Sequence, residues 1–236
     1  MKLSHTLPAT SAVFDDPNLV SAAGLVPALA LADRAGLRRL ADEHLSVPGD
    51  KGANAGLKVA SLIGGMVAGA DSIDDLDVVR SGGMKTLFDG VYAPSTIGTL
   101  LREFTFGHAR QLESVLREHL AELCARVDLL PGASERAFID IDSLLRPVYG
   151  HAKQGASYGH TKIAGKQILR KGLSPLVTTI STATGAPVIA GARLRAGKAN
   201  SGKGAARMVA QAIATARAAG VAGPILVRGD SAYGNS

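Results

Sequence analysis

The chain has 236 residues, of which 46% are hydrophobic and only 4% aromatic, with no Trp and a single Cys. This composition provides for one large or two modest domains with cores of Ala, Val, Ile and Leu. The lone Cys124 excludes an intrachain disulfide and is typical of the reducing cytoplasm, where we expect the protein. The most apolar stretch, residues 55–70, contains Lys58 and is shorter than the roughly 20 residues that span a bilayer, so we expect no membrane partner.

The net charge of +6 is distributed unevenly along the chain. Residues 1–130 contain 12 Lys and Arg against 16 Asp and Glu, a net charge of −4. Residues 131–236 contain 14 Lys and Arg against four acids, a net charge of +10. An excess of this size in one region favours a polyanion such as DNA as its partner. An ordinary solvated basic surface is the alternative.

Residues 17–128 are predicted to be all helical. The clearest helix carries apolar residues at helical spacing from Leu112 to Val127, with charged residues on its other face. The short helices predicted around Asp71–Phe104, interrupted at Gly82-Gly83, allow a helix-turn-helix that reads DNA. A helical bundle with an interaction role is the alternative for this half.

After Pro131 the pattern changes from helical to strand-like. Strands are predicted in chain order at residues 137–145, 175–182, 188–194 and 225–228. Residues 154–166 are predicted to be an extended polar stretch, and residues 203–219 an amphipathic helix. A meander of three strands, a helix and a crossover strand are typical of a mixed sheet of the ribonuclease H type. In such a sheet the first and fourth strands are neighbours.

Two acids in the first predicted strand indicate a metal site. Asp140 and Asp142 lie on the same face of that strand, because side chains alternate along a strand. If the first and fourth strands are neighbours, Asp142 meets Asp230, and two adjacent carboxylates repel each other unless a cation lies between them. Magnesium prefers such oxygen ligands together with phosphate, and two metal ions support phosphodiester chemistry. We predict Asp142 as the first ligand and Asp140 as the alternative; an exposed strand edge would explain both acids without a metal.

Four segments of the second half carry a family pattern: Phe-Ile-Asp-Ile-Asp-Ser-Leu at 138–144, Val-Tyr-Gly-His at 148–151, Gln-Gly-Ala-Ser-Tyr-Gly-His-Thr-Lys at 154–162, and Val-Arg-Gly-Asp-Ser-Ala-Tyr at 227–233. Together with the helical half they resemble the DDE transposases of bacterial insertion sequences, and most closely the group numbered thirteen-eighty. The resemblance implies a ribonuclease-H-like core in which Asp, Asp and Glu bind two Mg²⁺ ions, with Mn²⁺ as an alternative. It implies DNA as the partner: such enzymes cut and join DNA at the terminal inverted repeats of the element and at a target.

By this resemblance Asp142 corresponds to the first acid of the triad and Asp230 to the second. The third acid, a Glu on a later helix, has no counterpart, because the chain stops at Ser236, six residues after Asp230. We therefore expect a helical, DNA-binding domain at residues 1–130 and an incomplete ribonuclease-H-like mixed-sheet domain at 131–236. The expected protein is a transposase fragment, inactive alone, which forms a homodimer on DNA and associates with the nucleoid when bound. The alternative is an inactive DNA-binding remnant that competes with an intact transposase.

Basic residues of the second half are predicted to hold DNA phosphates with little choice of sequence. They are Lys153, Lys162, Lys166, Arg170, Lys171, Arg193, Arg195, Lys198 and Lys203.

The segment Gly197–Lys203 fits the nucleotide-binding pattern G-x-x-x-x-G-K between a predicted strand and a predicted helix. Gly204 stands where a Ser or Thr would bind magnesium, so a nucleotide-binding enzyme is only a third hypothesis. We prefer a basic turn whose backbone amides and Lys203 contact DNA.

Overall fold

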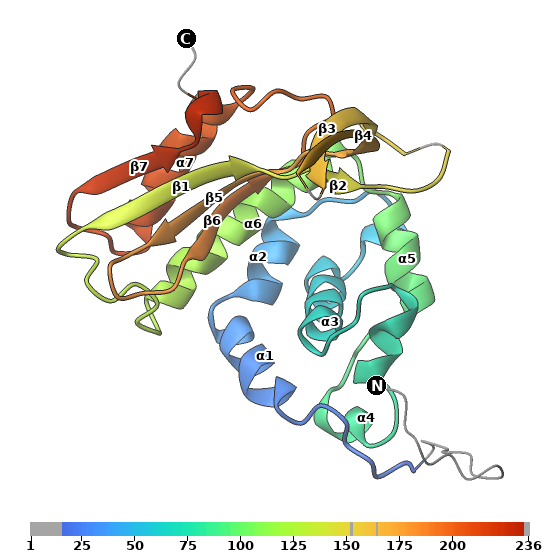
Figure 1. Cartoon of the computed structure of the whole chain (residues 1–236). Coiled ribbons are helices and arrows are strands. Elements are labelled where there is room, and N and C mark those ends of the chain that lie inside the picture. The colour runs from blue at the N-terminus through green and yellow to red at the C-terminus, as the bar shows by residue number, and fades with distance from the viewer. Residues whose placement is uncertain (1–15, 152, 164, 234–236) are drawn as a thin grey trace, which may run out of the picture.

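The computed structural model describes residues 16–151, 153–163 and 165–233 (Figure 1). Its first half is helical, as the sequence predicted. The α-helices there are α1 (Leu25–Arg34), α2 (Leu37–His44), α3 (Ala55–Val67), α4 (Met84–Leu87), α5 (Pro94–Arg102) and α6 (Phe106–Cys124), with 3-10 helices η1 (Asp50–Gly52) and η2 (Asp74–Val79) between them. In the described part of the chain, no helix has the length and apolar character needed to cross a membrane.

The helical half has a core of its own. Its buried side chains come from α2, α3, α5 and α6 and include Leu40, Val59, Leu100 and Val115. Gly56 lets α3 approach α2 closely, because a Cβ at this position would lie only 2.4 Å from the carbonyl oxygen of Arg38. The apolar periodicity recognised in the sequence therefore forms a packed bundle rather than a set of separate helices.

The helix-turn-helix interpretation of Asp71–Phe104 is wrong. That motif requires two regular helices joined by a turn of three or four residues. In this segment η2 is a 3-10 helix and α4 has only four residues, which leaves α5 as the one longer α-helix.

The second half contains a four-stranded sheet, and its elements agree with the predicted ones. They are β1 (Ala137–Ser143), β5 (Leu176–Ser181), β6 (Val188–Arg193), α7 (Ala205–Ala218) and β7 (Ile225–Gly229). The strand order is β6-β5-β1-β7. Strand β1 is antiparallel to β5 and parallel to β7. The predicted neighbourhood of the first and fourth strands is therefore confirmed, and α7 makes the crossover between β6 and β7.

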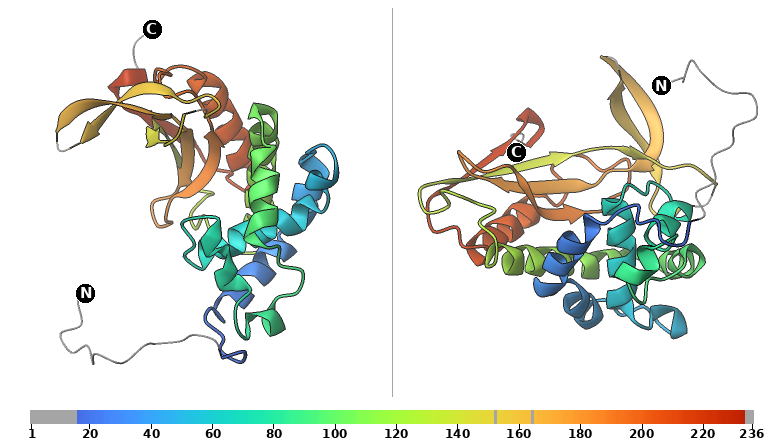
Figure 2. Two further views of the ribbon diagram at one scale, coloured as in Figure 1. Left: turned by 90° about the vertical axis from the view of Figure 1, so that its right-hand side faces the viewer. Right: turned by 90° about the horizontal axis from the view of Figure 1, so that it is seen from below.

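Helices α6 and α7 pack on one face of this sheet (Figure 2). Alternation along β1 sends Ile139 and Ile141 into the core, where both are buried, and Asp140 and Asp142 to the opposite face. Helix α6 contributes to two cores at once: Val115 packs among the other helices, whereas Leu120 packs against the sheet. The helical half and the sheet are thus joined through one long helix.

A second sheet interrupts the first between β1 and β5. It consists of β2 (Arg146–Pro147), β3 (Ser157–Ile163) and β4 (Lys166–Leu173), in the order β2-β4-β3. The sequence predicted only an extended polar stretch at residues 154–166. The hairpin of β3 and β4 was missed because most of its described residues are exposed, so its sequence lacks the alternating apolar face of a half-buried strand. The hairpin projects away from the rest of the molecule (Figure 2, right).

Candidate active site at the end of the four-stranded sheet

The structure brings Asp142 and Asp230 to the same end of the four-stranded sheet. In the parallel pair of β1 and β7, Asp140 lies opposite Arg228 and Ile141 opposite Gly229. Continuing this register by one residue places Asp142 beside Asp230, which directly follows β7. Both carboxylates are exposed. Two acids that are 88 positions apart in the sequence are therefore neighbours because parallel strands end at the same edge.

Asp140, the alternative ligand, has a different environment from Asp142. Its two carboxylate oxygens accept hydrogen bonds from Nε and Nη2 of Arg228, each at 2.7 Å. The guanidinium of Arg228 also lies over the ring of Phe138, 4.5 Å from its centroid. Hydrogen bonding to Asp140 raises the pKa of Arg228. The guanidinium of Arg228 therefore already neutralises the carboxylate of Asp140.

Asp142 and Asp230 form no ion pair with any described residue. Oδ1 of Asp142 accepts a hydrogen bond from the backbone N–H of Ser143 at 2.6 Å. Oδ1 of Asp230 accepts one from the backbone N–H of Ala232 at 3.0 Å. These backbone contacts orient one oxygen of each carboxylate and leave the other oxygen without a described partner. The pair is thus placed for an external cation, which Asp140 is not.

Tyr233 is a site residue that sequence reasoning missed. It ends the 3-10 helix η3 (Ser231–Tyr233), and its backbone N–H donates to the carbonyl of Asp230 at 3.1 Å. Its ring lies against Gly229, where an added Cβ would be 3.2 Å from Tyr233 Cδ2. The turn that begins at Asp230 therefore folds the tyrosine back under the ends of β1 and β7. Its position in the quoted segment 227–233, on the turn after an acid, was the signal available in the sequence.

The hydroxyl of Tyr233 lies within electrostatic reach of both carboxylates. Burial raises its pKa most and the charges of Asp142 and Asp230 raise it further, whereas the Ser143 hydroxyl and the charge of Arg195 lower it. The hydroxyl is therefore protonated at neutral pH. Its oxygen is buried and makes no hydrogen bond of normal geometry with a described residue.

These groups fit a hard divalent cation. Exposed carboxylates that sit side by side repel each other, and a cation between them removes that repulsion. Magnesium takes one or two carboxylates together with phosphate oxygens and water. Among the described residues no group of three or more His, Cys, Asp or Glu side chains is placed to hold a metal. Asp142 and Asp230 are thus the candidate pair of metal ligands at this end of the sheet.

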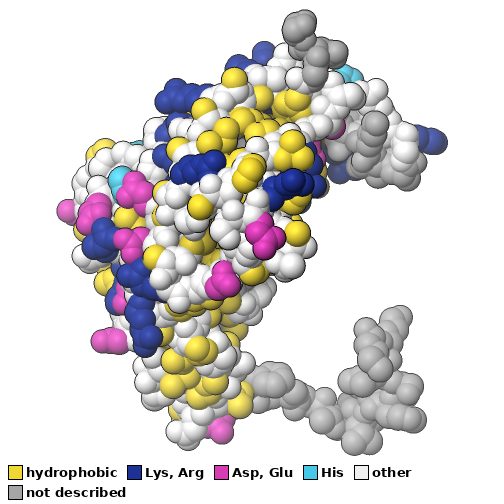
Figure 3. Space-filling model, turned by 90° about the vertical axis from the view of Figure 1, so that its left-hand side faces the viewer, with side chains coloured by type: hydrophobic (Ala, Val, Ile, Leu, Met, Phe, Trp, Pro, Cys, Tyr) yellow, Lys and Arg dark blue, Asp and Glu magenta, His cyan; other side chains and the backbone are white. Residues whose placement is uncertain are grey.

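The basic residues predicted to bind DNA separate into two groups. Exposed side chains belong to Lys153, Lys166, Arg170, Lys198 and Lys203. Lys171 is half-buried, and its Nζ donates to the carbonyl oxygens of Gly150 and His151 at 3.3 and 2.9 Å. The side chain of Lys162 lies outside the described part of the chain. In the space-filling view, Lys and Arg side chains gather over the upper part of the molecule, which the second half of the chain forms (Figure 3).

Arg193 and Arg195 form the second group and point into the protein. Arg193 is buried and donates to Gln211 at 2.6 Å and to Glu113 of α6 at 3.4 Å. Arg195 is also buried. Burial lowers the pKa of both guanidinium groups. Because both side chains are buried, we leave these two arginines out of the candidate DNA surface.

The loop Gly197–Lys203 does not have the form of a nucleotide-binding loop. A phosphate-binding loop presents backbone N–H groups to its ligand. Here the carbonyls of Asn200, Ser201 and Lys203 instead accept hydrogen bonds from Nη1 of Arg195 at 2.9 to 3.3 Å. The N–H of Lys198 donates to Ser157 Oγ and that of Lys203 to Asn200 Oδ1, both at 2.9 Å. The loop wraps a guanidinium, so these amides are not free for a nucleotide or for DNA.

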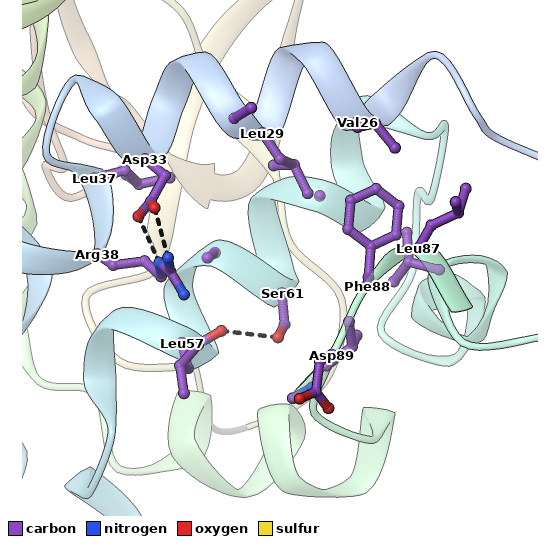
Figure 4. A pocket seen from close by; sticks show the side chains of 16 residues that line it. Val26, Leu29, Asp33, Leu37, Arg38, Leu57, Ser61, Leu87, Phe88 and Asp89 are labelled. Atoms are coloured by element: carbon purple, nitrogen blue, oxygen red, sulfur yellow. Dashed lines mark hydrogen bonds and ion pairs between the residues drawn. The ribbon is translucent and has the colours of Figure 1, made fainter. Parts of the chain in front are cut away.

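A pocket of about 380 Å³ lies in the helical half, away from the carboxylates (Figure 4). It is bounded by α1, α3 and the segment after α4, with Leu29 and Phe88 on its wall. At one end Arg38 pairs with both oxygens of Asp33 at 2.5 Å. Hydrogen bonding to Arg38 lowers the pKa of Asp33. This pair is satisfied within the pocket wall, and the pocket shares no residue with the end of the sheet.

The fold and the site define a mixed α/β protein with a carboxylate pair at the ends of two neighbouring parallel strands. A family model described as Transposase DDE domain group 1 matches residues 7–236. The chain therefore belongs to this family of DDE transposases, which act on DNA with divalent metal ions. The family implies a ribonuclease-H-like core, with which the observed strand order agrees. Comparison with curated proteins and comparison with solved structures gave no match.

Proposed function

We propose that this chain is part of a transposase that carries out cut-and-join phosphodiester transfer at the ends of an insertion sequence of the thirteen-eighty group, and that it supplies two of the three catalytic carboxylates. The observation that carries the proposal is the register of β1 and β7, which sets Asp142 beside Asp230. We assign these two acids as the first and second carboxylates of the site. The family's third carboxylate, a Glu, is not among the described residues around them.

Asp142 and Asp230 are proposed to hold one or two Mg²⁺ ions, or Mn²⁺ in their place. A metal pair of this kind activates an attacking oxygen and stabilises the leaving one. The backbone N–H groups of Ser143 and Ala232 hold the carboxylates in place. Arg228 keeps Asp140 engaged and so prevents it from competing for the metal. Tyr233 packs against Gly229 and so supports the turn that carries Asp230.

Cleavage of DNA tests the assignment. Labelled duplexes taken from the DNA that flanks the coding sequence are incubated with Mg²⁺ and the full-length transposase that contains this chain. We expect Asp142→Asn and Asp230→Asn each to lower the rate more than about a hundredfold. Even mutation of a residue that only hydrogen-bonds a metal ligand lowers activity by about 10- to 100-fold. Asp140→Asn is the matched control on the same strand face and is expected to stay within about tenfold, because Arg228 already binds Asp140. Equal loss for Asp140→Asn and Asp142→Asn would contradict the assignment.

Metal binding gives a readout that does not depend on turnover. Manganese bound to the protein is followed by electron paramagnetic resonance during titration. We expect Asp142→Asn and Asp230→Asn to weaken Mn²⁺ binding strongly, with Asp140→Asn close to wild type. Unchanged Mn²⁺ binding in the first two variants would exclude them as ligands.

The second candidate function is DNA binding without cleavage, as a competitor of an intact transposase. It is favoured by the exposed basic residues of the second half, which lie on β4 and in loops. Such binding needs no metal. It predicts that the chain holds element ends in EDTA and never cuts them when Mg²⁺ is added.

A further inference from the structure

The hairpin of β3 and β4 has two different faces. Residues directly opposite each other in an antiparallel pair point to the same side of it. Tyr158 pairs with Lys171, and His160 pairs with Leu169. By alternation Gln167 lies on that side too. We call Tyr158, His160, Gln167 and Leu169 the outer face of the hairpin.

The opposite face packs on the body of the protein at its base. Gly159 and Gly172 lie there and are buried. A Cβ on Gly159 would be only 2.0 Å from the carbonyl oxygen of Gly197, so the strand and the loop touch backbone to backbone. This contact fixes the orientation of the hairpin relative to the body of the protein. It leaves the outer face exposed to solvent. Tyr158 is 63% and Leu169 55% exposed.

The charge around the hairpin is of one sign. Residues 144–175 contain six Lys and Arg and no Asp or Glu. Lys166 and Arg170 are exposed on β4, on the side opposite the outer face. A two-stranded hairpin is at best marginally stable alone in water, and this one exposes large apolar side chains as well as cations. Both features call for an anionic partner that also offers apolar contact.

The hairpin begins at the candidate active site. Strand β1 ends at Ser143, one residue after Asp142, and β2 begins at Arg146. The backbone N–H of Leu144 donates to the carbonyl of Pro175 at 3.2 Å. This bond holds the segments that lead into and out of the second sheet at the same end of the four-stranded sheet. The eight residues of β4 extend about 26 Å at 3.3 Å per residue. The hairpin thus reaches outward from the end where Asp142 and Asp230 lie.

We propose that the outer face of this hairpin enters the major groove of the DNA duplex that the carboxylate site acts on, an inference that rests on the proposed function for the identity of the partner. The major groove, about 12 Å wide, admits a two-stranded β-ribbon. The length of β4 spans about eight base pairs at 3.4 Å each. Tyr158, His160 and Gln167 meet the base edges, and Leu169 contacts thymine methyl groups. Lys166 and Arg170 reach the phosphates that border the groove.

The electrostatic part is tested by binding of the full chain to a mixed-sequence duplex in EDTA, measured by fluorescence anisotropy at several salt concentrations. Each phosphate contact contributes about 0.9 to the slope of log K against log salt. We expect the double variant Lys166→Ala/Arg170→Ala to reduce the slope by about 1 to 2. The matched control, Arg34→Ala/Lys85→Ala, removes two exposed cations of the helical half and is expected to leave the slope unchanged. Equal slopes for both double variants and wild type would overturn the proposal.

Groove occupancy is tested on the same complex with dimethyl sulfate, which methylates guanine N7 in the major groove. Wild type is expected to protect guanines over a stretch of about eight base pairs. Tyr158→Ala/Gln167→Ala is expected to lose this protection while it retains the salt slope. Both side chains are exposed, so the variant is expected to fold, which circular dichroism checks. Protection that is unchanged in this variant, or absent in wild type, would overturn the proposal.

The two proposals fail separately. If no Mg²⁺-dependent cleavage is found but guanine protection depends on Tyr158 and Gln167, the catalytic assignment falls and the hairpin contact stands. If cleavage depends on Asp142 while the hairpin variants bind and protect as wild type does, the hairpin contact falls and the catalytic assignment stands.

Discussion

The four-stranded sheet and the three-stranded sheet belong to one basic half of the chain, in which the second is inserted between β1 and β5 of the first, but they are built differently. Helices α6 and α7 cover one face of the first, where Ile139 and Ile180 are completely buried. The hairpin of the second is open on its outer face, where Leu169 is 55% exposed. The first sheet is held by its core, whereas the second is held at its base by backbone contacts.

Basic side chains show the same contrast. Arg195, just after β6, is buried and surrounded by carbonyl oxygens. Arg170 on β4 is exposed and pairs with no acid among the described residues. A positive charge excess read from composition therefore combines arginines that build the protein with arginines that remain available to a partner.

The largest effect on stability is expected from truncating one isoleucine in each sheet and comparing the two losses. Ile180→Ala in β5 should lower the free energy of unfolding by about 3 to 4 kcal/mol, through lost burial and a cavity. Ile168→Ala in β4 should cost less than about 0.5 kcal/mol, because this side chain is partly exposed. Urea unfolding followed by circular dichroism measures both. Similar losses in the two variants would mean that the hairpin has a core after all.

The next effect concerns the two kinds of arginine. Arg195→Ala removes the donor for the carbonyls of Ser174, Asn200 and Lys203. Leaving buried acceptors unpaired should cost about 2 to 3 kcal/mol of unfolding free energy. Arg170→Ala should stay within about 0.5 kcal/mol, as an exposed position does. Thermal unfolding distinguishes them, and an unstable Arg170→Ala would show that this residue has a structural role.

The smallest of these effects tests the backbone contact at the base of the hairpin. Gly159→Ala should cost about 1 to 2 kcal/mol, because its Cβ would meet Gly197 and the strand must shift. Gly202→Ala is the control, since a Cβ there has no atom within 4 Å, and it should stay within about 0.5 kcal/mol. Hydrogen exchange of the β3 and β4 amides should report the local loss. Unchanged amide exchange rates in Gly159→Ala would show that this contact does not stabilise the base of the hairpin.

Apolar alternation and helical spacing were sufficient to predict β1, the pair β5 and β6, α7 and β7. These elements have one buried face, and burial selects the residue types that reveal it. The same signal is weak in β3 and β4, because a hairpin exposed along most of its length places no such requirement on its sequence. The helix-turn-helix failed for a related reason: apolar residues between Asp71 and Phe104 pack into the bundle without forming two regular helices.

The sequence by itself determined which acids are candidates, the sign of the charge and the family pattern, because these depend on residue identity and order. Only the tertiary structure showed that Asp140 pairs with Arg228 of β7, which favours Asp142 as the candidate ligand. It also turned Arg193 and Arg195 inward and packed Tyr233 against Gly229 at the end of β7. Pairing across strands and packing between distant segments assign each side chain its neighbours, and no local pattern contains that information.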